Sequence, residues 1–130
     1  MSEGIKVIGN KIFFYSDVSD ESVFELVTTI HSMEHMGKLT IFIKSDGGDV
    51  YAGLCAMDHL KTSPIEITTV ADGLCASSAT LILFGGDHRL MLPNSRILIH
   101  QLSSDFSGKF EEFKNEKRNL KSIMKQIREI

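Results

Sequence analysis

A short apolar run at residues 39–43 lies between two segments with helical spacing, and this arrangement constrains the fold most. The run reads Leu-Thr-Ile-Phe-Ile, which is typical of a strand buried within a parallel sheet. Before it, apolar side chains at 23, 26, 27, 30 and 33 share one helix face, with Ser19 as the expected N-cap. After it, a second helical pattern runs from Val50 to Leu60 and ends before Pro64. Strands that alternate with helices predict an α/β fold.

The alternation continues along the rest of the chain. Residues 6–15 predict two short strands around a Gly-Asn turn, and residues 65–70 predict a strand that ends at an Ala-Asp-Gly turn. A short helix before Gly85 and Gly86 and two strands on either side of Pro93 follow. Glycine is a common helix stop, and the Pro-Asn pair is a turn signal.

One long helix is predicted from about residue 109 to 130. Phe113, Leu120 and Ile127 repeat in it every seven residues. At 1.5 Å per residue such a helix spans about 31 Å, which is comparable to a whole small domain. We therefore expect it to pack against another subunit; the alternative is a helix lying along its own domain.

Length, charge and cysteine content exclude several classes of protein. With 130 residues the chain predicts a single domain, 1–130, and its net charge of −3 argues against nucleic-acid binding. No uninterrupted apolar stretch is long enough to span a membrane, and the first residues lack the pattern of a signal peptide. Two cysteines, Cys55 and Cys75, indicate a reducing compartment, and we expect a cytoplasmic protein.

A serine and a histidine are the candidates for chemistry. Two turns are built from small residues, one at 47–48 and one at 73–79, where glycine permits positive φ and close backbone approach. Ser77 lies in the second turn, and His100 ends the apolar strand at 96–99. His100 is either a hydrogen-bonded core histidine or a general base beside a serine nucleophile, with the glycine turns forming an oxyanion hole.

Three segments together resemble ClpP, the proteolytic subunit of the ATP-dependent Clp protease. Ser-Asp-Gly-Gly at 45–48, with Val50, Ala52 and Gly53, resembles the first glycine-rich motif of that family. Gly-Leu-Cys-Ala-Ser-Ser-Ala at 73–79 resembles its nucleophile segment. Leu-Pro-Asn-Ser-Arg-Ile-Leu-Ile-His-Gln at 92–101 resembles its histidine segment almost residue for residue. The resemblance covers about residues 10–130.

The resemblance implies a fold, a site and an activity. The fold is the ClpP/crotonase-like superhelix of repeated β-β-α units, with the C-terminal helix as a handle through Phe113, Leu120 and Ile127. Ser77 resembles the nucleophile and His100 the base, and the N–H groups of Gly48 and Ser78 resemble the oxyanion hole. The implied function is a serine endopeptidase that cleaves unfolded or short peptides.

The resemblance also implies partners. It implies a homo-oligomer of heptameric rings stacked in pairs, which encloses the serines in a chamber, and an AAA+ unfoldase as its partner. The segment before Ile12 offers little of the axial loop through which relatives dock that ATPase. No cofactor and no metal is implied. A short member of this kind would suit a phage or another divergent lineage.

The chain departs from the family at the third member of the triad. The family places this aspartate beyond the long helix, and Asp72, Asp87 and Asp105 do not match its position. The sequence is a fragment, or another group orients His100, or the protein is a shortened relative of weak or no activity. We favour the first. Asp46 replaces the usual proline of the first motif, and Ser78 replaces a methionine.

Other functions fit less well. The main alternative is a non-catalytic assembly subunit with the same fold. An enoyl-CoA hydratase-like enzyme would carry carboxylates in place of Ser77 and His100, and a signal-peptide peptidase would use a Ser-Lys pair and an anchor. His31 and His35 have metal-like spacing but no third ligand accompanies them, so we predict a solvated pair. We expect Cys75 to be a small packed residue.

Overall fold

The computed structural model describes residues 4–99 of the 130-residue chain. The elements in chain order are β1 (Gly4–Ile8), β2 (Lys11–Tyr15), α1 (Asp20–Ser32), the 3₁₀ turn η1 (Glu34–Met36), β3 (Lys38–Ser45), α2 (Val50–Thr62), β4 (Glu66–Ala76), α3 (Ala79–Phe84), β5 (His88–Met91) and β6 (Arg96–Leu98). Within these residues the alternation predicted from sequence is confirmed.

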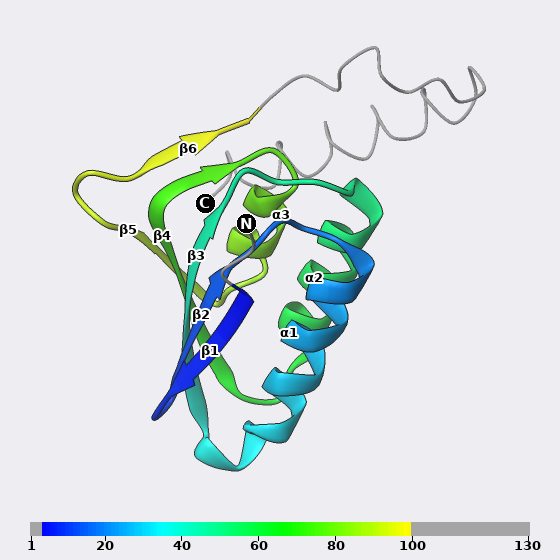
Figure 1. Cartoon of the computed structure of the whole chain (residues 1–130). Coiled ribbons are helices and arrows are strands. Elements are labelled where there is room, and N and C mark those ends of the chain that lie inside the picture. Colours follow the sequence, from blue (N-terminus) through cyan, green and yellow to red (C-terminus); the bar gives the residue numbers. More distant parts are fainter. Residues whose placement is uncertain (1–3, 100–130) are drawn as a thin grey trace. The chain divides into compact units, whose positions relative to one another are not determined.

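The strands of residues 4–99 form one six-stranded sheet in the order β1-β2-β3-β4-β5, and β6 pairs with the second half of β4. Only β1 and β2 are antiparallel; the other pairs are parallel. Helices α1, α2 and α3 lie on the same side of the sheet (Figure 1). Because the carboxyl ends of parallel strands meet at one edge, the loops after β2, β3 and β4 lie close together.

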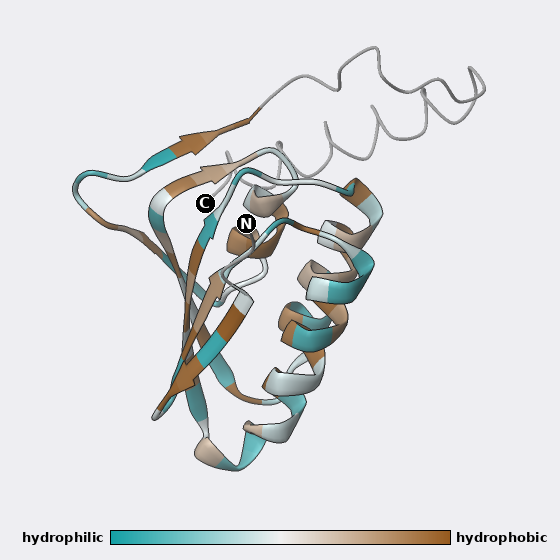
Figure 2. Cartoon of the chain, viewed as in Figure 1, coloured by the Kyte–Doolittle hydropathy of each residue, from teal (hydrophilic) through white to brown (hydrophobic). Residues whose placement is uncertain are grey.

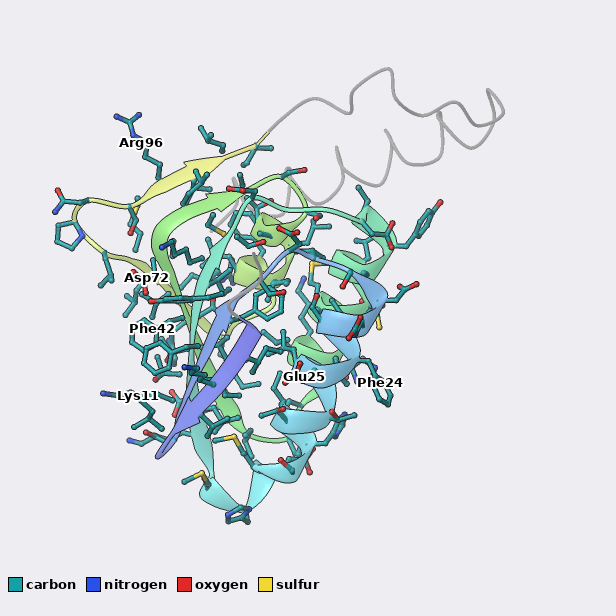
Figure 3. The ribbon with its side chains drawn as sticks, in the orientation of Figure 1. Lys11, Phe24, Glu25, Phe42, Asp72 and Arg96 are labelled. Carbon is teal, nitrogen blue, oxygen red and sulfur yellow. The ribbon has the colours of Figure 1, made fainter. Side chains whose placement is uncertain are left out.

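The core lies between the sheet and the helices. Alternate residues of β3, namely Leu39, Ile41 and Ile43, are fully buried on the helix side. Figure 2 shows the apolar colouring concentrated along the strands and on the sides of the helices that face them. On the other face of the sheet Phe13 and Phe42 stack with their ring centroids 4.9 Å apart. Figure 3 shows Phe42 and Asp72 on this face, away from the helices.

The first helix begins as its sequence predicts. Ser19 is the N-cap of α1, and its Oγ accepts a hydrogen bond from the Ser22 backbone N–H at 3.0 Å. In return, the Ser19 N–H donates to the Ser22 Oγ at 2.9 Å, which completes a capping box.

The predicted end of the fourth strand is wrong, because β4 continues from Glu66 to Ala76 instead of turning at residues 71–73. Gly73 has a positive φ of 75°, yet the strand resumes after it and pairs with β6. Ser95 fills the gap between β5 and β6: its Oγ accepts from the Gly73 N–H at 3.0 Å and donates to the Ala71 carbonyl at 2.9 Å. A bend therefore replaces the predicted turn.

The predicted helix stop at Gly85 and Gly86 is confirmed. Glycine is needed at Gly85 because there is no room for a side chain, and not because the backbone is left-handed. Gly85 caps α3 with a φ of −75°. A Cβ on Gly85 would lie 2.8 Å from the Leu60 Cβ, so a side chain here would push α3 away from α2.

Several predictions lie outside the described residues. These are His100, the long helix, and the handle residues Phe113, Leu120 and Ile127. Residues 4–99 belong to one compact unit, and the single domain over 1–130 stays a prediction. Within residues 4–99 no helix is long and apolar enough to cross a membrane.

Candidate active site

Ser77 occupies a backbone corner between β4 and α3. Its φ is 56°, and it is the single non-glycine residue with positive φ among residues 4–99. A left-handed conformation costs a serine roughly 1–2 kcal/mol, so the surrounding contacts must hold it in place. The same strand-to-helix corner exposes the nucleophilic serine in α/β-hydrolases.

Hydrogen bonds hold this corner on both sides. The Ser77 N–H donates to the carbonyl of Leu98 in β6 at 2.8 Å. The Ser77 carbonyl accepts from the Thr80 backbone N–H at 3.0 Å and from the Thr80 hydroxyl at 2.6 Å. The Ser77 hydroxyl itself makes no hydrogen bond to any residue in 4–99 and is half-buried, which leaves it available to a base or a substrate.

The glycine loop after β3 packs directly on the corner. A Cβ on Gly47 would lie 2.7 Å from the Ser77 Cβ and 2.8 Å from the Ala76 carbonyl oxygen. The φ of Gly47 is 101°, which also favours glycine. The buried Ser45 shapes this loop, because its Oγ accepts from the Gly47 N–H at 3.1 Å. The glycine of this first motif therefore allows the loop backbone to approach the backbone of the serine corner closely.

Gly48 is held from the opposite side by Val18, in the segment between β2 and α1. The Val18 N–H donates to the Gly47 carbonyl at 2.9 Å, and the Val18 carbonyl accepts from the Asp49 N–H at 2.8 Å. A Cβ on Gly48 would overlap the Val18 carbonyl. This bridge uses the Gly47 carbonyl and the Asp49 N–H, on either side of Gly48, and the N–H of Gly48 itself has no partner within residues 4–99.

Two backbone N–H groups beside the serine are thus uncommitted within residues 4–99. Like that of Gly48, the N–H of Ser78 donates to no group in the described residues. The Ser78 nitrogen would lie 3.2 Å from a Cβ on Gly47, so it faces the glycine loop. Ser78 also begins α3, where free N–H groups favour negative charge. This arrangement can stabilise a developing oxyanion.

The side chains beneath the corner are buried. Cys75 is fully buried, and this burial raises the pKa of its thiol from 9.0 to about 12. It is therefore a packed residue, as expected, and not a thiolate nucleophile. The Ser78 hydroxyl is also buried and has no hydrogen-bond partner in the described part of the chain.

The two described carboxylates considered for the third triad position are engaged elsewhere. Asp87 accepts the Ile67 backbone N–H at 2.8 Å and so closes the turn after α3. Asp72 accepts a hydrogen bond from the Tyr15 hydroxyl on the outer face of the sheet. That bond, with partial burial and the Asp72 charge, raises the pKa of Tyr15 from 10.0 to about 12. Asp105 lies outside the described residues.

A pocket of about 200 Å³ adjoins the glycine loop. Its lining comes from the carboxyl ends of β2 and β3 and from β4: Tyr15, Ser16, Asp17, Lys44, Ser45, Asp46 and Leu74. The Lys44 ammonium lies 5.5 Å from the centre of the Tyr15 ring. Asp46, which replaces the usual proline, is exposed here and adds a negative charge next to the corner.

The structure brings together Ser77, Gly48 and Ser78 from two loops of the predicted site, whereas His100 lies outside the described residues. The sequence did not predict the residues whose hydrogen bonds hold this site in place. Val18 and Leu98 act through backbone groups, and nothing in their side-chain types signals this role. Thr80 could have been found, because a threonine three residues after a corner can bond back to its carbonyl.

Taken together, the parallel sheet, the left-handed serine corner and the packed glycine loop define an α/β fold of the ClpP type. ClpP1 from Listeria monocytogenes superposes with a TM-score of 0.83 at 24% identity, covering 90% of this chain and 71% of that one. The ClpP protease catalytic domain from Plasmodium falciparum gives a TM-score of 0.76 at 27% identity, covering 90% and 65%.

The family model for Clp protease matches residues 6–130, and the chain belongs to the Clp protease family. The ATP-dependent Clp protease proteolytic subunit of Pleurastrum terricola is 32% identical over 124 residues, which are 92% of this chain and 63% of that protein. Proteolytic subunit 3 of Rhodococcus jostii (strain RHA1) is 35% identical over 94 residues, which are 71% and 46%. The chain therefore spans about three fifths of the length of the first relative and about half that of the second.

Proposed function

We propose that this protein is a serine endopeptidase in which Ser77 attacks the carbonyl of an extended peptide. The observation that carries this proposal is the left-handed Ser77 corner, with the N–H groups of Gly48 and Ser78 beside it that have no partner within residues 4–99. Family membership supports the same function, because the relatives are named proteolytic subunits.

In the proposed mechanism His100 takes the proton from the Ser77 Oγ as that oxygen forms a bond to the peptide carbonyl carbon. The hydrogen bond from Ser77 to Leu98 supports this role, because it ties the corner to the chain two residues before His100. The negative charge on the carbonyl oxygen is stabilised by the N–H groups of Gly48 and Ser78, and losing one such donor typically costs about 3–4 kcal/mol of barrier. His100 then protonates the leaving amine, and water hydrolyses the acyl-enzyme.

We also propose the assembly and the setting that the resemblance implies. These are a homo-oligomer of stacked heptameric rings, held by Phe113, Leu120 and Ile127, and an AAA+ unfoldase as partner. Two cysteines without a disulfide support a reducing compartment such as the cytoplasm.

A fluorophosphonate probe, which reacts with activated serines, tests the proposed activity. We expect labelling of the full chain at Ser77, its loss in Ser77→Ala, and at least a hundredfold slower labelling in His100→Ala. Thr68→Ala, on β4 and remote from the corner, serves as a matched control that keeps labelling. Circular dichroism checks that each variant is folded.

Absence of labelling in a folded, oligomeric protein would overturn the proposal and favour the alternative, a non-catalytic assembly subunit. Asp72 and Asp87 form hydrogen bonds with other residues away from the corner, and this observation favours the non-catalytic alternative.

A further inference from the structure

Two histidines from different helices meet on the surface of the helical layer. The Nε2 of His31, in the last turn of α1, lies 3.2 Å from the Nδ1 of His59, in the last turn of α2. Their rings are nearly perpendicular, at 88°, with centroids 5.4 Å apart. The prediction of a solvated His31 and His35 pair did not anticipate this contact, because 28 residues separate His31 from His59.

A carboxylate holds the first of these rings. The Nδ1 of His31 lies 3.0 Å from the Oε1 of Glu34, in η1. Because a carboxylate accepts hydrogen bonds, this contact favours the tautomer with its proton on Nδ1, in which the Nε2 on the side of His59 carries a lone pair that can bind a metal. Carboxylates that orient a histidine in this way are a regular feature of metal sites.

The spacing of the two nitrogens fits a shared cation. Tetrahedral Zn²⁺ with Zn–N bonds of about 2.0–2.1 Å holds neighbouring ligand atoms about 3.3 Å apart, close to the observed 3.2 Å. The side chain of His31 is about half exposed, at 52%, so an ion and its water ligands have access. A hydrogen bond between the two rings would give the same distance, and zinc titration distinguishes the two cases.

We propose that His31 and His59 form a site for a divalent transition-metal ion of the Zn²⁺ type, with Glu34 as the residue that orients His31. Water completes the coordination, because no group of three or more metal-binding side chains exists within residues 4–99. The bound ion would connect the end of α1 to the end of α2 and stabilise the folded chain, since the two ligands are adjacent only when both helices pack.

Calorimetric titration of ZnCl₂ into the full chain at pH 7.5 tests the site. All proteins carry Cys55→Ser, because an exposed thiol one turn before His59 is itself a potential zinc ligand and would complicate the titration. We expect one binding event that weakens at least tenfold in His31→Gln and in His59→Gln. Glu34→Gln should weaken it about tenfold, the usual effect of removing an orienting carboxylate.

Two other exposed histidines provide matched controls. His35 follows Glu34 in η1, and His88 lies on β5 beside Glu66. His35→Gln and His88→Gln should leave the event unchanged. An event that persists at full strength in both His31→Gln and His59→Gln, or that weakens equally in the controls, would overturn the proposal. So would an absence of any binding, which would leave the hydrogen bond between the rings as the explanation.

Thermal unfolding gives a second readout that does not depend on peptidase activity. Zn²⁺ should raise the unfolding temperature of the Cys55→Ser protein and of its His35→Gln variant but not that of its His59→Gln variant. An equal rise in all three would also contradict the site.

Discussion

At the scale of single residues, the serine corner depends on neighbours that leave no room for side chains. Ser77 keeps a left-handed backbone because Leu98 and Thr80 bind its two peptide groups and Gly47 lies against its Cβ. Strain of this kind persists only where the surroundings over-determine it. Substitutions at Gly47 and Ser78 test two separate parts of this support.

Gly47→Ala should destabilise the fold by about 3 kcal/mol or more, because the new Cβ meets the Ala76 carbonyl as well as the Ser77 Cβ. Urea unfolding followed by circular dichroism measures the change. Gly37→Ala is the matched control: its φ is also positive, at 80°, but nothing lies within 4 Å of the added Cβ, so about 1 kcal/mol is expected. Equal losses in both variants would contradict close packing at Gly47.

Ser78→Ala should raise the free energy of unfolding by about 1 kcal/mol, because it removes a buried hydroxyl that has no partner in the described residues. The Ser78 backbone N–H is unchanged, so fluorophosphonate labelling of Ser77 should persist. The same urea titration gives the stability. A loss of more than 1 kcal/mol would mean that the hydroxyl makes a stabilising hydrogen bond.

At the scale of elements, local signals decide where helices begin. The capping box at the start of α1 satisfies a backbone N–H that the helix cannot satisfy itself. The end of β4 shows the opposite case, because Ser95 and β6 extend a strand past a glycine that marks a turn in isolation.

Ser19→Ala should lower the free energy of unfolding by about 1 kcal/mol through loss of the N-cap. Ser32→Ala, in the last turn of the same helix, is the control, because its exposed hydroxyl only bonds back to the Thr29 carbonyl. A change within about 0.5 kcal/mol is expected there. Indistinguishable effects of the two substitutions in thermal or urea unfolding would argue against the cap.

At the scale of the whole molecule, stability depends on pH through groups whose protonated form the fold prefers. The pKa values of Tyr15 and Cys75 are both raised, to about 12, one mainly by the bond to Asp72 and the other by burial. A raised pKa means that the folded state holds its proton more tightly than the unfolded chain does. These contributions are therefore complete below about pH 9 and are lost as the pH rises towards 12.

We expect the urea midpoint to fall steeply between pH 9 and pH 12, and less steeply in Tyr15→Phe and in Cys75→Ala. Cys55→Ala serves as the control, because Cys55 is exposed. An unchanged slope in both test variants would show that other groups govern the alkaline transition.

Local sequence patterns predicted the helices, most of the strand bounds and the nucleophile candidate. Helical spacing, the Ser19 cap and the apolar run at 39–43 act over a few residues, and a short motif around Ser77 carries its resemblance in the same local way. These signals can be read without knowing the fold, because the backbone interactions that produce them act over a few residues.

The contacts between distant segments become visible only once the chain is folded. The bridge from Val18 to Gly48, the extension of β4 and the meeting of His31 with His59 join positions that are 28 or more residues apart, or depend on a partner strand. No local pattern encodes these contacts, because they arise only when the sheet and the helices pack and bring backbone groups into register.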